Sequence, residues 1–180
     1  MSTVEPIREK SDIQRVKSVL RKQSLRNLLL FLIGINCGLR ISDILNLDVR
    51  DVRGKDNIYI IEQKTGKHRI VPINRCLQNY INEFVKAKRD EEPLFVSYKG
   101  NRMSRFTAYN IIRKACRDAG IDTYVGTHTM RKTFGYHFYK RYNNVVMLQK
   151  IFNHSHPVIT LSYIGIEQDE ILDNCRKFVL

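Results

Sequence analysis

The stretch that decides the fold runs from Leu25 to Leu47 and reads LRNLLLFLIGINCGLRISDILNL. Its first half is almost wholly apolar, which predicts a buried helix from Leu25 to about Cys37 that is too short to span a bilayer. Ser24 is a favourable cap for the start of this helix, and Gly38 suits the left-handed position that ends one. A short third helix is expected to start at Ser42, with leucines and an isoleucine as its apolar positions.

The sequence on either side of this stretch adds one more helix and a change of period. Upstream, Ser11-Asp12-Ile13-Gln14 resembles a capping box that opens an amphipathic helix. Downstream, Asn57–Gln63 and Arg69–Ile73 are rich in β-branched residues and are separated by a turn that contains Gly66. Glycine supplies the positive φ that such a turn requires, so this segment predicts a β-hairpin.

The remainder of the chain reads as helices separated by short breaks. Further helices are expected at 76–88 and 104–119, with a short strand at 94–97 between them. From His128 the pattern is helical, with breaks near 143–144, 153–157 and 165, and a last helix at 167–180. Because no repeat or Pro/Gly/Ser-rich linker interrupts the chain, we expect one domain over residues 1–180, mainly α with a small antiparallel β-hairpin.

The charge balance points to a polyanionic partner. Thirty-one Lys and Arg face 18 Asp and Glu, giving a formal net charge of +13 and a pI near 9.8. Basic groups release the counterions condensed on a phosphate backbone, so DNA is favoured. An anionic membrane is disfavoured, because no helix combines a bulky apolar face with a strongly basic one. The four cysteines lack the spacing of metal ligands. We expect reduced thiols that lie mostly in the core, and a cytosolic protein.

Four motifs resemble the signatures of one family, the tyrosine recombinases of the phage integrase type. They are GLRISDILNL at 38–47, KTGK at 64–67 followed by VPI at 71–73, THTMRKTF at 127–134, and FNHS at 152–155 followed by TLSYI at 160–164. They run in family order, and His154 precedes Tyr163 by nine residues, as the last motif requires. Asn153 departs from the glycine that is usual there. One such motif is weak evidence, whereas four in order are strong evidence.

The resemblance implies a set of catalytic residues and a DNA breaking-rejoining fold. In the family, an arginine pair binds the scissile phosphate, a hairpin lysine protonates the leaving oxygen, and a tyrosine forms a 3′-phosphotyrosine bond with DNA. An acidic residue three positions after the first arginine supports them, and here that residue is Asp43. The implied catalytic residues of this chain are Arg40, Lys64, His128, Arg131, His154 and Tyr163.

The residue types suit that chemistry on physical grounds. Phosphodiester transfer concentrates negative charge on non-bridging oxygens, and a site without metal must offset that charge with fixed donors. The planar guanidiniums of Arg40 and Arg131 stay charged and form paired hydrogen bonds with phosphate. A tyrosine hydroxyl attacks poorly until a base helps, and the motif places His128 in that role. No metal and no cofactor are expected.

Each of these residues also has an ordinary structural interpretation. Lys64 could be a solvated turn lysine, Tyr163 could be one of many core tyrosines, and Lys67 is the rival to Lys64 within the turn. Other basic or aromatic residues are expected to contact DNA, although a solvated basic face is about as probable for each one alone. These residues are Lys67, Arg69, Arg102, Arg105, Tyr109 and Lys132.

The resemblance also predicts how the protein acts. Only 39 residues precede Arg40, so the separate helical domain that larger members carry before the catalytic one is expected to be absent. The protein is expected to be a monomer in solution. On two specific DNA sites it is expected to form a tetramer in which protomers exchange residues 167–180. Its expected location is the cytoplasm, in association with the nucleoid. The leading function is recombination for a phage or mobile element. The alternatives are a DNA-binding regulator that has lost strand exchange, and a topoisomerase that uses the same chemistry.

Overall fold

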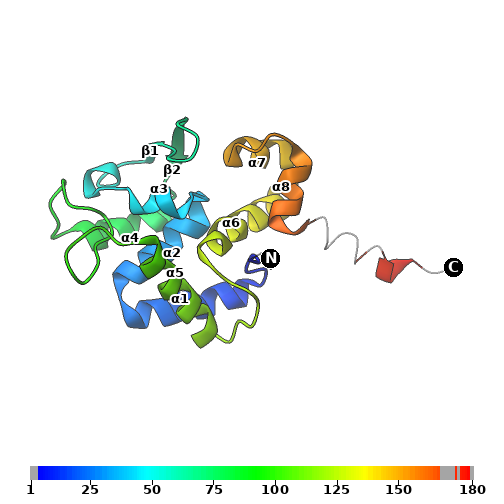
Figure 1. Cartoon of the computed structure of the whole chain (residues 1–180), viewed down its shortest axis with the longest axis horizontal. Coiled ribbons are helices and arrows are strands. Elements are labelled where there is room, and N and C mark those ends of the chain that lie inside the picture. Colours follow the sequence, from blue (N-terminus) through cyan, green and yellow to red (C-terminus); the bar gives the residue numbers. More distant parts are fainter. Residues whose placement is uncertain (1–3, 167–172, 174, 179–180) are drawn as a thin grey trace.

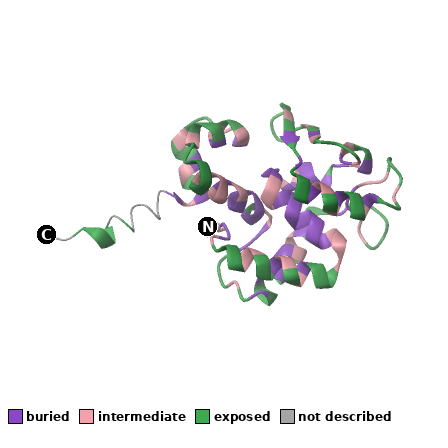
Figure 2. Ribbon diagram, turned by 180° about the vertical axis from the view of Figure 1, so that it is seen from behind, coloured by how far each residue is buried: buried purple, intermediate pink, exposed green. Residues whose placement is uncertain are grey.

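The computed structural model describes residues 4–166, 173 and 175–178. Its centre is α2 (Leu25–Cys37), as the apolar sequence predicts. The Ser24 side chain accepts a hydrogen bond from the amide of Asn27, and Gly38 ends the helix with a φ of 58°. Both expected end signals are therefore confirmed, and Figure 2 shows the buried residues gathered along this central helix.

Two helix starts differ from expectation by a few residues. The first helix, α1 (Lys10–Gln23), begins before the supposed capping box, with Glu9 as its cap and without a side-chain cap bond. The Glu9 carbonyl accepts from the amide of Ile13, so the backbone has already entered the helix before Ser11. Likewise α3 (Ile41–Leu45) begins after Arg40, one residue earlier than expected.

The hairpin is confirmed with slightly shorter strands. β1 (Asn57–Ile61) pairs antiparallel with β2 (His68–Pro72), with Tyr59 opposite Ile70. A short 3-10 helix, η1 (Val49–Asp51), precedes the hairpin. The expected strand at 94–97 is wrong, because Val96 forms only an isolated bridge with Arg102. A single bridge is too little pairing to form a strand, and the sheet consists of β1 and β2.

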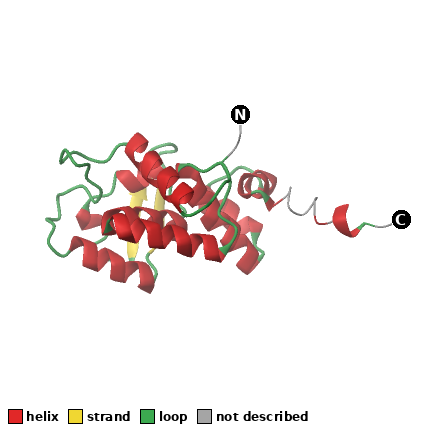
Figure 3. Ribbon diagram, turned by 90° about the horizontal axis from the view of Figure 1, so that it is seen from below, coloured by secondary structure: helices red, strands yellow, loops and turns green. Residues whose placement is uncertain are grey.

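The remaining helices follow the predicted breaks. They are α4 (Arg75–Val85), α5 (Arg105–Asp118), α6 (Thr127–Tyr142), α7 (Val145–Phe152) and α8 (Pro157–Ile164). Asn143, Asn153 and Gly165 end the last three with positive φ angles of 48°, 55° and 76°. Figure 3 shows the two strands among the helices, and Figure 1 shows the hairpin and α7 on the same side of the molecule.

Two hydrophobic clusters hold these elements. The larger one is built around α2 and includes buried side chains of α1, α4, α5 and both strands. The smaller one consists of Leu148, Phe152, Ile164 and Ile166, with α6 aromatic residues packed against it. Helix α6 joins the two clusters, because Met130 belongs to the first and Phe134 packs against the second.

Three expectations about single features have different outcomes. Cys37 and Cys116 are buried, but Cys76 and Cys175 are exposed, so the expectation that most cysteines lie in the core is wrong. No helix among the described residues is long and apolar enough to cross a membrane. The expected helix at 167–180 lies mainly outside the described residues, and its exchange between protomers stays a prediction.

Candidate active site

The first wall of the candidate site is the turn between α2 and α3. Arg40 occupies the cap position of α3, immediately after the glycine turn that ends α2. Its Nη1 lies 2.7 Å from Oε2 of Glu62 at the end of the hairpin's first strand. Asp43, on the first turn of α3, is buried and accepts a hydrogen bond from the amide of Gln63 at 3.1 Å. Two side chains of this wall are thus fastened to the residues that directly precede Lys64.

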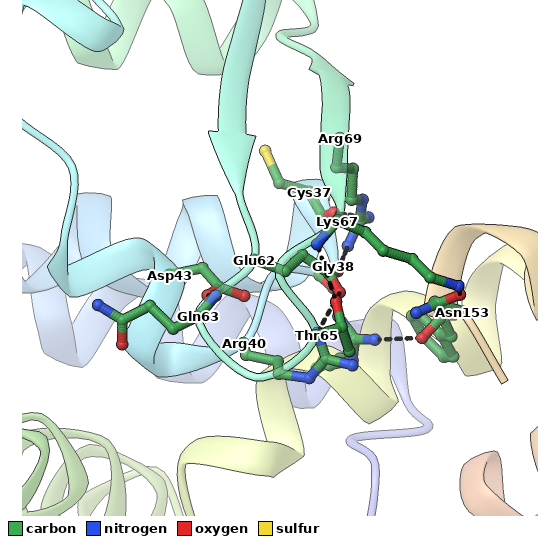
Figure 4. Close-up of polar contacts among 12 residues, drawn as sticks. Cys37, Gly38, Arg40, Asp43, Glu62, Gln63, Thr65, Lys67, Arg69 and Asn153 are labelled. Carbon is green, nitrogen blue, oxygen red and sulfur yellow. Dashed lines mark hydrogen bonds and ion pairs between the residues drawn. The ribbon is translucent and has the colours of Figure 1, made fainter.

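The second wall is the turn of the hairpin, residues 62–67. Glu62 is buried, and its carboxylate also accepts from the Thr65 hydroxyl at 2.8 Å. Gly66 adopts a φ of 66°, as the hairpin pattern predicts. Lys64 is exposed within this turn and lines the same groove as Arg40. The turn therefore carries a buried carboxylate, drawn with Arg40 and Thr65 in Figure 4, and the exposed side chain of Lys64.

Helix α6 supplies the third wall through its first two turns. Arg131 is buried, donates to the carbonyl of Gly38 and donates to the carbonyl of Phe152 at 3.0 Å. Its guanidinium therefore bridges the end of α2 and the end of α7. His128 lies one turn earlier on the same face, at the mouth of the groove.

Helices α7 and α8 supply the remaining two residues. The Tyr163 hydroxyl lies 3.4 Å from Nδ1 of His128, and its ring meets the His154 ring edge-on with centroids 5.2 Å apart. His154 Nδ1 lies 3.0 Å from the hydroxyl of buried Thr160. This contact leaves Nε2 as the ring nitrogen of His154 that is available to another ligand.

Asn153 accounts for the departure from glycine in the last motif. Its φ of 55° is the left-handed conformation that glycine adopts freely and that asparagine tolerates better than most residues. Its side-chain oxygen accepts a hydrogen bond from Lys67 Nζ at 2.8 Å. The rival lysine of the hairpin turn is therefore occupied with α7, whereas Lys64 faces the groove.

A groove of about 530 Å³ with a cationic lining lies between α3, the hairpin turn, the start of α5 and His128 of α6, and its lining does not include Arg131, His154 or Tyr163. Its charged or titratable lining residues are Arg40, Lys64, Arg102, Arg105 and His128. No cluster of three or more His, Cys, Asp or Glu side chains suited to a metal occurs among the described residues. A groove of this charge is suited to an anion such as a DNA phosphate.

The pKa values of the site reflect burial and crowded positive charge. Burial lowers the pKa of Arg131 to about 10, with Arg40 and Arg69 adding repulsion. Loss of solvent around the imidazole lowers the pKa of His128, and the charges of Arg131, Lys132, Arg40 and Lys64 lower it further. The pKa of His154 is lowered by burial and by Arg131 and Arg40. Both imidazoles therefore favour their neutral forms.

The pKa values of Tyr163 and Glu62 are shifted in opposite directions. Burial raises the pKa of the Tyr163 phenol, although Arg131 and Arg40 act in the opposite direction. Burial also favours protonation of Glu62, but hydrogen bonds from Arg40 and Thr65 and the charges of Arg40 and Arg69 hold its pKa below the usual value. The phenol thus rests protonated while the carboxylate is charged.

The residues expected to contact DNA divide into two groups. Arg105 is exposed at the start of α5 and lines the groove, Tyr109 follows one turn later, and Lys67 is exposed on the hairpin turn. Lys67 also donates to Asn153, and Arg102, Arg69 and Lys132 make internal contacts. Arg102 donates to the carbonyls of Leu45 and Leu47 and pairs with Asp48, although it still borders the groove.

Arg69 and Lys132 lie differently from the expectation of a phosphate contact. The Arg69 guanidinium is largely buried, lies 3.4 Å from Glu62 and donates to the carbonyl of Cys37. The Lys132 side chain is 5% exposed, and its ammonium lies 5.1 Å from the centre of the Tyr163 ring. Both cations therefore support the site from inside rather than from its surface.

Glu62 is the residue of the site that the sequence does not reveal. A glutamate just after a strand is ordinarily solvated, so its residue type does not mark it as buried. The available signal is the two-residue period of the strand, which places Glu62 on the same face as Ile58 and Ile60.

Comparisons with known proteins identify the family of this chain. The sequence pattern of the phage integrase family matches residues 8–170. The chain is 46% identical over 170 residues to the probable integrase/recombinase YoeC of Bacillus subtilis, with 94% of this chain and 93% of YoeC covered. It is 26% identical to the tyrosine recombinase XerA of Pyrococcus horikoshii, with 92% of this chain but 59% of XerA covered.

Solved structures share the fold at low sequence identity. A XerA recombinase superposes with a TM-score of 0.77 at 20% identity, over 97% of this chain and 65% of that one. A lambda integrase, in a dimer bound to a core DNA site, superposes with a TM-score of 0.74 at 13% identity, over 93% of this chain and 50% of that one. The chain thus spans nearly all of YoeC but only one half to two thirds of the Xer and lambda proteins.

Proposed function

Since the chain belongs to the phage integrase family of tyrosine recombinases, we propose that it cleaves and rejoins DNA at specific sites through Tyr163. The observation that carries the proposal is the 3.4 Å approach of the Tyr163 hydroxyl to His128 beside a cationic groove lined by Arg40 and Lys64. A nucleophile, a base and fixed positive charge are the components that metal-free phosphoryl transfer requires.

In this proposal the Tyr163 oxygen attacks the scissile phosphorus and the bond from phosphorus to the 5′ oxygen breaks. His128 accepts the phenol proton, and its lowered pKa keeps it neutral and able to do so. Lys64 donates a proton to the departing 5′ oxygen. The products are a 3′-phosphotyrosine bond and a free 5′ hydroxyl. Attack by a 5′ hydroxyl of another strand reverses the same steps without an energy source.

Three further side chains offset the charge that develops on the non-bridging oxygens. Arg40 follows Gly38 by two residues, and Arg131 donates to the Gly38 carbonyl. His154 offers Nε2, because its other ring nitrogen contacts Thr160. Asp43 acts indirectly by holding the amide of Gln63, next to Lys64.

The DNA surface includes the groove and the exposed start of α5. Arg105 and Tyr109 are the proposed base-side contacts, and Lys67 and Arg102 are the proposed phosphate contacts. A XerH recombinase of similar fold is bound to its difH substrate in a solved structure, and the lambda integrase is a dimer on its core site. We extend DNA binding and assembly on DNA to this chain by that likeness.

A nicked suicide substrate tests the cleavage proposal. Strand cleavage next to the nick releases a short fragment, so that the protein stays attached to the 3′ end and migrates as a covalent adduct. Tyr163→Phe should abolish the adduct and leave DNA binding intact. An adduct formed by the phenylalanine variant would overturn the assignment of Tyr163, and binding without any adduct by the wild type would favour a DNA-binding regulator.

Product analysis on two target sites separates recombination from relaxation of supercoils. Assembly is tested separately by light scattering with the chain cut at Gln168. If residues after that point link protomers into a tetramer, the shortened chain should bind DNA but form smaller complexes. Unchanged assembly would reject the exchange.

A further inference from the structure

The carboxylate of Glu62 stands at the junction of the two walls that carry Arg40 and Lys64. One oxygen, Oε2, lies 2.7 Å from Arg40 Nη1 and accepts from the Thr65 hydroxyl at 2.8 Å. The other oxygen, Oε1, lies 3.4 Å from Arg69 Nη1. The side chain is 2% exposed, so these contacts form largely out of solvent (Figure 4).

The backbone of the same residue closes the hairpin turn. The Glu62 amide donates to the carbonyl of Lys67 at 3.0 Å, and its carbonyl accepts from the amide of Gly66 at 2.8 Å and of Thr65 at 3.3 Å. Lys64 therefore sits in a loop whose two ends are joined by Glu62. Within this turn, one residue binds Arg40 through its side chain and the Lys64 loop through its main chain.

The surrounding charge explains why a carboxylate is needed here. Burial is the main cause that lowers the pKa of Arg69 and of Arg131, and the nearby charge of Arg40 lowers both further. Arg131 is held by two backbone carbonyls, which are neutral acceptors. Glu62 is the negative group shared by the other two guanidiniums. A neutral side chain of the same size would leave their repulsion uncompensated.

We propose that Glu62 is a positioning residue that fixes the Arg40 guanidinium relative to the turn of Lys64. The inference rests on the proposed function and adds a residue to it. In the proposed function, Arg40 binds the scissile phosphate and Lys64 protonates the 5′ oxygen that leaves it. A displaced guanidinium or a displaced turn would therefore separate two groups that must act on one phosphate. Misplacement of about 1 Å in such an arrangement costs about 10²-fold in rate.

The test is single-turnover cleavage of the suicide substrate by E62Q, with saturating protein and with DNA affinity measured separately. The variant keeps the size of the side chain and removes its charge. We expect adduct formation about 10²-fold slower than in the wild type, with DNA affinity within about threefold. Circular dichroism confirms that the folded fraction is equal.

E92Q is the matched control, because Glu92 also contacts two cations, Arg89 and Lys88, but lies outside the groove. It should cleave at the wild-type rate. The cleavage rate of the double variant E62Q/R69Q distinguishes positioning of Arg40 from a purely structural role of Glu62. Removal of the second guanidinium relieves the uncompensated repulsion on Arg40, so the double variant should cleave faster than E62Q.

Each outcome is decisive. A wild-type rate for E62Q, with Y163F inactive, overturns the inference and leaves the proposed function standing. Equal losses of rate, affinity and folded fraction, with no recovery in E62Q/R69Q, show a structural residue and also overturn it. A wild type that forms no adduct overturns the proposed function and this inference together.

Discussion

The two arginines of the proposed clamp are held in different ways. Arg131 is buried on α6 and donates to two backbone carbonyls, one at the end of α2 and one at the end of α7. Arg40 lies at a helix cap with its charge against a carboxylate from the hairpin. Backbone carbonyls fix a guanidinium without changing the net charge, whereas a carboxylate fixes it and also reduces repulsion. The α6 side of the site is thus organised by packing and the hairpin side by charge.

The same contrast extends to the whole molecule. The hairpin side rests on the large cluster around α2, while Tyr163 is carried by the small cluster of α7 and α8. Arg131 and the close contact at Gly135 connect the small cluster to α6. The proposed nucleophile, Tyr163, is therefore carried by the less extensive of the two clusters.

The largest effect is expected at Arg131, whose guanidinium joins the ends of α2 and α7. Arg131→Lys keeps a charge but loses the planar fork that reaches both Gly38 and Phe152. We expect single-turnover cleavage to fall by at least about 10²-fold. We also expect a loss of about 1–3 kcal/mol in the free energy of unfolding, because a buried carbonyl is left without its donor. Urea denaturation and the suicide-substrate assay measure the two effects. Retention of both would mean that the fork is not the connection.

A pair of glycine variants compares the two clusters directly. A Cβ on Gly135 would lie 2.7 Å from Ile164 and from Phe152, whereas a Cβ on Gly34 would lie 2.7 Å from Met130 in the large cluster. Each alanine variant should lose about 1–3 kcal/mol of stability through overpacking. Gly135→Ala should also slow cleavage, because it pushes α7 and α8 away from α6.

The Gly34→Ala variant serves as the control for that comparison. Measured at equal folded fraction, its cleavage rate should stay near that of the wild type. If both variants cleave equally well, or equally poorly, the small cluster has no special part in placing Tyr163.

The pH dependence of the cleavage rate tests the role of His128 on α6. His128 acts as a base only when neutral, and its pKa is lowered by burial and by Arg131, Lys132, Arg40 and Lys64. The activity it supports is therefore present above its lowered pKa and is lost as the pH falls through that value. The second-order cleavage rate at low DNA concentration, which reports the free protein, should have its acidic midpoint below 6.5.

Lys132→Met tests the cause of that shift. Removing one cation near His128 should raise the acidic midpoint toward the ordinary value of 6.5. A midpoint that stays unchanged in this variant would mean that Lys132 does not influence the base.

The smallest effect is expected at the exposed link between the two sides. Lys67→Met removes the hydrogen bond from Lys67 Nζ to Asn153 and should slow cleavage about fivefold or less, since exposed polar contacts contribute little. Lys55→Met, at another exposed lysine before the hairpin, should have no effect. A loss for Lys67→Met as large as that of Arg131→Lys would refute the contrast between packed and exposed connections.

Much of the fold was predictable because its signals are local. The Ser24 cap, the Gly38 turn, the hairpin glycine and the three late breaks each depend on a few neighbouring residues. The capping box at Ser11 and the strand at 94–97 were wrong because hydrogen bonds made by the backbone overrode residue preferences. Sequence patterns thus located the ends that a strong cap or a left-handed residue marks, and failed where backbone pairing decided the outcome.

The sequence by itself determined the chemistry that is available, through an arginine, a lysine, a histidine, a second arginine, a second histidine and a tyrosine, in that order along the chain. Only the tertiary structure decided which of these groups meet. The approach of Tyr163 to His128, the use of Lys67 by Asn153 and the burial of Glu62 between Arg40 and Arg69 join residues between 7 and 86 positions apart. Contacts of this kind depend on how helices and the hairpin pack, and electrostatic partners across such distances leave no periodicity in the chain.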